Sequence, residues 1–134
     1  MKKNVKRFVF DKLVRDAVPE MLKSQGVDPC FRVLSHDEFL DRLKDKLQEE
    51  SEEVREAHHS DEMIEELADV LEVIHSLAAA HGIQWQSIEQ KRTSKRTERG
   101  GFDAKTYVSH VDIEENNPYI ATFSLRPKHY PEVT

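Results

Sequence analysis

The sequence predicts a mainly α-helical bundle of about four helices, with a small β element formed by the N- and C-terminal segments. Apolar residues recur at helical spacing through the middle of the chain, which favours amphipathic helices. Charged residues make up 34% of the sequence, and it contains only four glycines, a composition typical of helix-rich proteins. At 134 residues, the whole chain is expected to form a single domain with one modest core.

The first elements along the chain are short. Residues 5–10 alternate imperfectly between polar and apolar side chains, and residues 30–34 have a similar composition, so both are predicted as short strands. Between them, Asp16 is the candidate N-cap of a short helix that ends before Gly26.

Two long amphipathic helices are predicted at the centre of the chain. Ser35 and Glu38 form a capping-box pattern that opens a helix from about His36 to Ala57. Ser60 is expected to cap a second helix, which ends before Gly82. Such consecutive helices can form an antiparallel hairpin that brings their faces together.

The remaining third of the chain is predicted to contain one more helix and two strands. The helix runs from about Trp85 to Arg99, where two consecutive glycines stop it. Residues 107–111 and 119–125 are β-prone and are separated by a turn-rich Asn-Asn-Pro sequence. They belong to a C-terminal extension, residues 106–134, that is expected to supply part of the small sheet.

The central stretch from Leu47 to Val73 is strongly acidic, with eleven acidic residues against a single arginine. Glu50 lies about 20° from Leu43 around its helix, which places a carboxylate within the apolar stripe. This is costly unless the carboxylate is paired, protonated or bound to a metal. Like-charge neighbours such as Glu66 and Asp69 also oppose their helix, and no comparable set of lysines or arginines is interleaved with them. A hard divalent cation, Mg²⁺ with Mn²⁺ as a substitute, would relieve this repulsion.

The order of these acids resembles a known motif. Glu49-Glu50-x-x-Glu53, twelve residues, and then Glu66-x-x-Asp69 resemble the EExxE…ExxD motif of the all-α nucleoside triphosphate pyrophosphohydrolases. That superfamily contains MazG, phosphoribosyl-ATP pyrophosphohydrolase and the dimeric dUTPases. Segments 12–26, 65–82 and 99–102 look like those of the small stand-alone MazG-like proteins, and the resemblance spans about residues 10–110.

The resemblance implies a MazG-like bundle with Mg²⁺-dependent activity that cleaves a nucleoside triphosphate between its α- and β-phosphates, giving a monophosphate and pyrophosphate. It leaves open whether the substrate is phosphoribosyl-ATP, a non-canonical nucleotide or an ordinary dNTP. Members of the family are oligomeric, so a homodimer or higher homo-oligomer is expected. The residues that the resemblance assigns are the metal ligands Glu50, Glu53, Glu66 and Asp69; the catalytic Glu49 and Glu50; and the substrate-binding Lys12, Arg15, Lys95 and Arg99. Glu49 is either a further ligand or the base that orients the attacking water.

The cations that would hold the phosphates are expected after the acidic helices. Lys91, Lys95 and Arg99 recur every four residues, so they form one row on their helix. The same row also fits a solvated helix end that places cations on its C-terminal dipole.

Two rival functions fit parts of the same pattern. A di-iron carboxylate bundle uses Glu-x-x-His pairs, which occur at Glu56–His59 and Glu72–His75. An acidic helical module that binds a basic partner without any metal is the non-enzymatic alternative. Iron content would identify the first, and a lack of stabilisation by Mg²⁺ would favour the second.

Composition limits the remaining classes of protein. No apolar run has membrane-spanning length, and the basic N-terminus lacks the long apolar region of a secretory signal, so a cytoplasmic protein is expected. The single cysteine excludes an internal disulfide. A formal net charge of −6 argues against a general nucleic-acid-binding protein.

Overall fold

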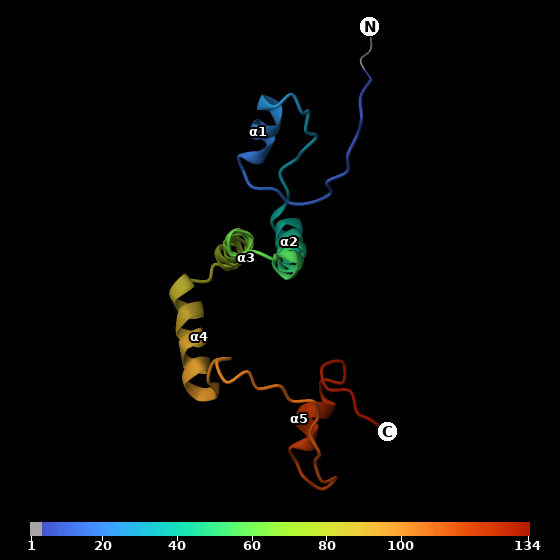
Figure 1. Cartoon of the computed structure of the whole chain (residues 1–134), viewed down its shortest axis with the longest axis vertical. Coiled ribbons are helices and arrows are strands. Elements are labelled where there is room, and N and C mark those ends of the chain that lie inside the picture. Colours follow the sequence, from blue (N-terminus) through green and yellow to red (C-terminus); the bar gives the residue numbers. More distant parts are fainter. Residues whose placement is uncertain (1–3) are drawn as a thin grey trace. The chain divides into compact units, whose positions relative to one another are not determined.

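The structure of the protein is a computed structural model, and it describes residues 4–134. It is helical, as the sequence predicts, and its chain divides into two compact units, Met1–Lys95 and Arg96–Thr134. The helices are α1 (Val18–Ser24), α2 (His36–Glu56), α3 (Ser60–Ala80), α4 (Trp85–Arg99) and α5 (Ile120–Ser124), as labelled in Figure 1. The assignment of residues 1–134 to a single domain stays a prediction.

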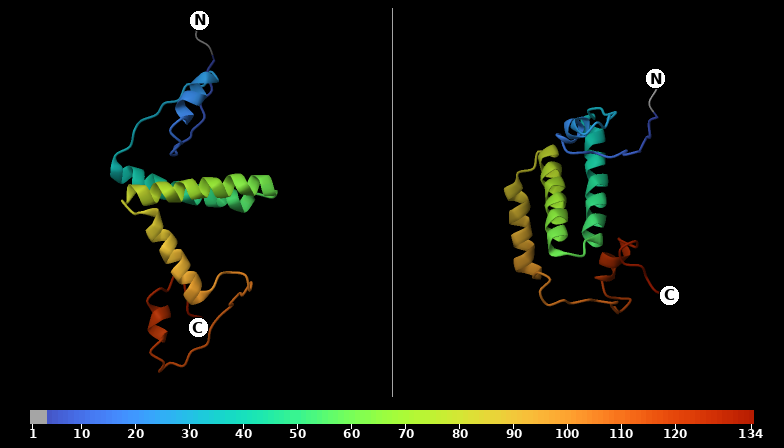
Figure 2. Two further views of the ribbon diagram at one scale, coloured as in Figure 1. Left: turned by 90° about the vertical axis from the view of Figure 1, so that its left-hand side faces the viewer. Right: turned by 45° about the horizontal axis from the view of Figure 1, so that its top comes forward.

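Helices α2 and α3 form the antiparallel hairpin that organises the first unit, and they lie side by side in both views of Figure 2. The Ser35 hydroxyl accepts a hydrogen bond from the Glu38 amide at 3.3 Å, so the predicted cap of α2 is confirmed. Leu43 from α2 and Val73 from α3 are buried, with 3% and 7% of their surface exposed. These side chains form the core that fixes the two helices relative to each other.

Two other predicted caps are wrong. Helix α3 begins at Ser60 itself, and His59, in an extended conformation, takes the N-cap position without a side-chain hydrogen bond. Ala17 takes that position in α1, one residue after Asp16. In both cases acidic residues in the first turn supply the negative charge that the helix dipole favours.

The predicted bounds of α4 are confirmed at Trp85 and Arg99. Gly100 follows with φ 83°, a left-handed conformation that glycine adopts readily and that ends the helix. At the other end, the Trp85 ring stacks on His75 of α3, with ring centroids 3.6 Å apart and an interplanar angle of 18°. This stack attaches the start of α4 to the hairpin.

The small β element predicted at the two ends of the chain is wrong, because no strand forms anywhere in residues 4–134. Segments 5–10, 30–34 and 107–111 are irregular, and 119–125 contains helix α5. The Asn117 side chain accepts a hydrogen bond from the Tyr119 amide at 2.9 Å, which starts a helical turn there. Phe123 of α5 then makes edge-to-face contacts with the rings of Tyr119 and Tyr130.

One apolar stripe of α3 remains exposed. Ile64, Leu67 and Leu71 are separated by three and four residues, so they share one face, and their exposed fractions are 66%, 52% and 48%. By contrast, the apolar side chains buried within the described residues are those of Leu43, Val73 and Ala78. The hairpin therefore has a small core beside an uncovered apolar face.

Helices α2 and α3 each have 21 residues but are heavily charged. Across residues 4–134, no helix combines the length and apolar character that crossing a membrane requires.

Candidate metal centre

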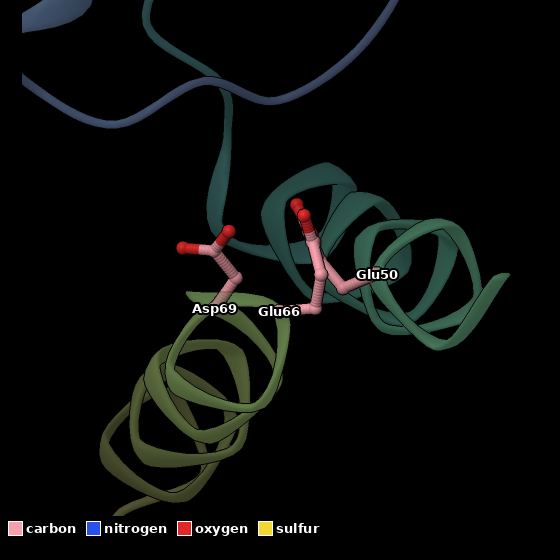
Figure 3. Close-up of side chains that lie close together, drawn as sticks. All are labelled: Glu50, Glu66 and Asp69. Carbon is pink, nitrogen blue, oxygen red and sulfur yellow. The ribbon is translucent and has the colours of Figure 1, made fainter. Parts of the chain in front are cut away.

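Three of the acids predicted as metal ligands lie together. Glu50 extends from α2, and Glu66 and Asp69 extend from α3, one helical turn apart. Each offers a carboxylate oxygen, and these oxygens all lie within 4.8 Å of one another. Figure 3 shows the three carboxylates pointing to the same side of the hairpin. Antiparallel pairing of α2 and α3 thus joins two parts of the motif that are far apart in sequence.

The electrostatic environment of this cluster is strongly negative. Burial raises the pKa of the Glu66 carboxyl above its ordinary value, and the charges of nearby acids, above all Glu53 and Asp69, raise it further. Glu50 is the buried member, with 9% of its surface exposed, while the other two are partly exposed. Three oxygen ligands of this kind, accessible from one side, fit a hard divalent cation that keeps water ligands.

Two cations from the segment before α1 contact the acids. Arg15 donates a hydrogen bond to an Asp69 carboxylate oxygen at 2.7 Å. Lys12 pairs with Glu49 at 3.2 Å. The four side chains are between one third and three fifths exposed, so these are solvent-accessible ion pairs. The segment predicted to bind substrate therefore lies beside the acidic helices.

A third cation, Lys46, was missed in the sequence. Its Nζ lies 3.2 Å from Glu49 Oε1 and 3.3 Å from Glu50 Oε1. With Lys12 and Arg15 it relieves part of the repulsion between the acids, although none of the three cations is interleaved with the acids in sequence. The signal was present, because Lys46 precedes the two glutamates by three and four residues, a spacing that brings helical side chains together.

Glu49 and Glu53 lie outside the group of three oxygens that could share an ion. Burial acts to raise the pKa of the Glu49 carboxyl, but hydrogen bonds from Lys12 and Lys46 outweigh it and hold that pKa below its ordinary value. Glu53 lies close enough to Glu66 for its charge to raise the pKa of that residue. The roles that the sequence predicts for Glu49 and Glu53 stay predictions.

Lys95 and Arg99 of α4 are the predicted phosphate-binding residues. Among the described residues, neither forms an ion pair with the acids of the cluster. Lys95 borders an open hollow on α4, and Arg99 belongs to the second compact unit. Residues that line the hollow are Ile83, Ser87, Ile88, Lys91, Arg92 and Lys95. Substrate binding by Lys95 and Arg99 stays a prediction.

The geometry gives the di-iron alternative no support. His75 is stacked against Trp85 rather than directed to the carboxylates, and His59 precedes α3 at its N-cap. Within residues 4–134, the group that could hold an ion contains carboxylates and no histidine. A di-iron site of this type needs a histidine from each of two Glu-x-x-His pairs.

The acidic helical hairpin carries the EExxE…ExxD pattern, which resembles the motif of the all-α nucleotide pyrophosphohydrolases. Comparison with known families agrees: residues 31–96, which contain α2, α3 and most of α4, match the family described as phosphoribosyl-ATP pyrophosphohydrolase. Residues 31–96, just under half of the chain, are thus similar to that family, which lies within the MazG-like superfamily that the motif resembles. This match supports a hydrolase that acts on a pyrophosphate bond of a nucleotide.

Similar proteins add little about activity. A protein of Mycolicibacterium smegmatis described as uncharacterized is 43% identical over 53 residues, which make up 40% of this chain and 54% of the relative. The chain therefore matches only about half the length of that relative. No solved structure matches this chain.

Proposed function

We propose that this protein hydrolyses a nucleoside triphosphate, or the triphosphate-like group of phosphoribosyl-ATP, between the α- and β-phosphates in the presence of Mg²⁺. The products are a nucleoside monophosphate and pyrophosphate. The observation that carries the proposal is the convergence of Glu50, Glu66 and Asp69, whose oxygens lie within 4.8 Å of one another on two packed helices. The family match of residues 31–96 supports the same reaction class.

The three carboxylates fit Mg²⁺, which prefers a few carboxylate oxygens together with waters and substrate phosphates. When bound, the ion neutralises phosphate charge and polarises the bond that breaks. Glu50 from α2 and Glu66 and Asp69 from α3 would hold the ion, so the packing of the hairpin would set the spacing of the ligands. Glu53 is the further predicted ligand, next to Glu66.

Lys12 and Arg15 supply positive charge beside these ligands. Their partly exposed pairs with Glu49 and Asp69 contribute little stability individually, so exchanging a carboxylate for a phosphate oxygen costs little. Arg15 in particular can donate two parallel hydrogen bonds to a phosphate. We assign both residues to the polyphosphate of the substrate, and Lys95 and Arg99 to the same role from α4.

Glu49 is assigned to the attacking water. Its pKa lies below the ordinary value because the hydrogen bonds from its two lysine partners outweigh burial, so the carboxylate is ionised at neutral pH and can accept a hydrogen bond from water. Its position next to Glu50 in sequence keeps it close to the proposed metal ligands while it stays outside their group.

We also propose that the protein forms a homodimer through α3. The exposed stripe of Ile64, Leu67 and Leu71 offers one continuous apolar face on α3, and the small core of the hairpin leaves that face without a cover in the first unit. Burial of each such side chain stabilises an assembly by about 1.5–3 kcal/mol. A second copy of the chain, presenting the same stripe, is a self-complementary partner in a twofold dimer.

Pyrophosphate release across a panel of nucleotides tests the activity. The panel contains phosphoribosyl-ATP, the common dNTPs and oxidised or deaminated nucleotides, each assayed with MgCl₂ and with EDTA. We expect one substrate class to give pyrophosphate and monophosphate in equal amounts, in the presence of MgCl₂ only, and the Glu66→Gln variant to be inactive. Release of inorganic phosphate, or hydrolysis by Glu66→Gln at the wild-type rate, would contradict the proposal.

The same preparation separates the enzyme from an acidic binding module. A non-hydrolysable triphosphate together with Mg²⁺ should raise the melting temperature, because ligands that bind only the folded state stabilise it. An unchanged melting temperature, together with no hydrolysis of any nucleotide, would favour the module.

A further inference from the structure

Lys46 is the most buried cation among the ion pairs of the described residues. Its side chain is 19% exposed, whereas those of Lys12 and Arg15 are 45% and 58% exposed. Removing an ammonium group from water is costly unless it is paired. The structure therefore holds this positive charge against the acids at some cost, which a solvated lysine on the opposite face of α2 would not incur.

The ammonium group of Lys46 bridges two neighbouring carboxylates. It lies 3.2 Å from Glu49 Oε1 and 3.3 Å from Glu50 Oε1. Glu50 is also one of the three residues that could share an ion. Its carboxylate therefore borders two cation positions, that of the Lys46 ammonium and that of the proposed metal ion. In two-metal sites a carboxylate likewise lies between two cations, which are about 3.5–4 Å apart.

The charge of the site agrees with a single ion. The motif supplies five carboxylates, Glu49, Glu50, Glu53, Glu66 and Asp69. Three cations contact members of this set, Lys12, Arg15 and Lys46. In the absence of a substrate, two negative charges therefore remain, which equals the charge of one divalent ion. A second divalent ion in the same place would leave an excess positive charge.

We infer that Lys46 occupies the place of a second metal ion and restricts this site to one divalent cation, held by Glu50, Glu66 and Asp69. The inference rests on the proposed function, since it takes the divalent ion from there. It assigns Lys46 a positioning role: the ammonium group keeps Glu49 out of the ligand set and leaves that carboxylate to face water. The metal stoichiometry of the site is then set by one residue of α2.

Binding of Mn²⁺ to the full chain, measured by the loss of the free-ion signal in electron paramagnetic resonance, tests this directly. Wild-type protein is expected to bind one Mn²⁺ per chain. Lys46→Met removes the ammonium group and keeps an unbranched side chain that is one atom shorter, so a second Mn²⁺ should bind between Glu49 and Glu50. Adding Glu49→Gln to Lys46→Met removes a ligand of that second ion and should restore one Mn²⁺ per chain.

Lys44→Met is the matched control, because Lys44 is exposed on the same helix and the change in net charge is identical. It should bind one Mn²⁺, as the wild type does. Lys46→Gln serves as a second variant that keeps a polar group at this position, and circular dichroism verifies that each protein is folded.

The outcomes distinguish the role of Lys46 from the proposed metal site. Two Mn²⁺ ions on the wild type, or a single ion on both folded Lys46 variants, would overturn the inference and leave a metal-dependent hydrolase intact. A second ion on Lys44→Met would also overturn it, because the effect would then come from net charge alone. A wild-type protein that binds no Mn²⁺ would overturn the proposed function together with the inference.

Discussion

Asp69→Asn separates the stability of the hairpin from its proposed affinity for metal. Asp69 accepts a hydrogen bond from Arg15 at 2.7 Å and shares the acidic cluster with Glu50 and Glu66. Asparagine has nearly the same shape but carries no charge. In the absence of metal the substitution therefore has two opposing effects, the loss of one ion pair and the relief of repulsion between carboxylates.

The two effects nearly cancel. Loss of the partly exposed pair with Arg15 costs about 0.2–1 kcal/mol. Repulsion between Asp69 and Glu50, whose oxygens lie within 4.8 Å, amounts to about 0.9 kcal/mol in a water-like dielectric. The metal-free variant should thus lie within about 1 kcal/mol of the wild type, a change in melting temperature of about 4 °C at most.

In the presence of Mg²⁺, the difference in stability between the wild type and Asp69→Asn should be much larger. At a concentration about 100 times its dissociation constant, an ion stabilises the folded state by about 2.7 kcal/mol, which raises the melting temperature by roughly 10 °C. Losing one of three carboxylate ligands should weaken binding by about 100-fold, a size typical of changes around metal sites. At the same Mg²⁺ concentration, the stabilisation of Asp69→Asn then falls to about 0.4 kcal/mol.

Thermal unfolding followed by circular dichroism, in EDTA and in MgCl₂, measures both quantities. Glu72→Gln is the control, because it removes one charge from an exposed position of α3 outside the cluster, and its response to Mg²⁺ should equal that of the wild type. An undiminished Mg²⁺ shift in Asp69→Asn would refute the ligand assignment. A loss of several kcal/mol in EDTA would instead show that Asp69 mainly maintains the fold.

Three further substitutions test the core, the acid dependence and the dimer. Leu43→Ala should lower the free energy of unfolding in urea by about 2–4 kcal/mol, because Leu43 is 3% exposed; a loss below 1 kcal/mol would contradict its place in the core. The lowered pKa of Glu49 contributes stability that is present above the ordinary pKa of glutamate and lost as pH falls through the lower folded value. Glu49→Gln should therefore flatten the acidic limb of stability against pH, and an unchanged limb would contradict the pairing with Lys12 and Lys46. Leu67→Glu should convert the proposed dimer to a monomer in sedimentation velocity, and an unaltered sedimentation coefficient would exclude the α3 stripe as its interface.

The elements that the sequence predicts well are those with strong local signals. Helix α2 begins after Ser35, whose hydroxyl bonds to the backbone three residues later, and α4 ends where Gly100 takes a left-handed conformation. Both signals act within one turn of the chain, so no knowledge of the tertiary structure is needed to read them. The periodic apolar residues between them then identify the helices.

The C-terminal segment shows where local signals fail. Residues 119–125 are rich in β-branched and aromatic side chains, yet they contain α5. A short apolar run cannot by itself distinguish a strand from a helix. Here the Asn117 side chain accepts a hydrogen bond from the Tyr119 amide just before α5, and Phe123 contacts Tyr119 and Tyr130. A strand also needs a partner to pair with, and the described residues provide none.

The convergence of Glu50, Glu66 and Asp69 was predictable because their positions on two helices imply that antiparallel packing brings them together. Their cations were not predictable to the same degree. Lys12 and Arg15 come from an irregular segment whose path depends on tertiary contacts, and they reach acids 37 and 54 residues away. Lys46 is different, because its spacing to Glu49 and Glu50 is local and visible in the sequence.

The cations and the acids together explain how the chain can fold with so many carboxylates before any ion binds. Arg15 and Lys12 hold Asp69 and Glu49 from one side through partly exposed pairs, which exchange readily with water or phosphate. Lys46 holds Glu49 and Glu50 from within α2 through a less exposed contact. In the proposed function, a polyphosphate would therefore recruit Lys12 and Arg15 without disturbing Lys46. Glu66 has no such partner in the described chain, and its raised pKa reflects burial and the charges that remain around it. That uncompensated charge is the reason that we propose a divalent ion as a ligand of this hairpin.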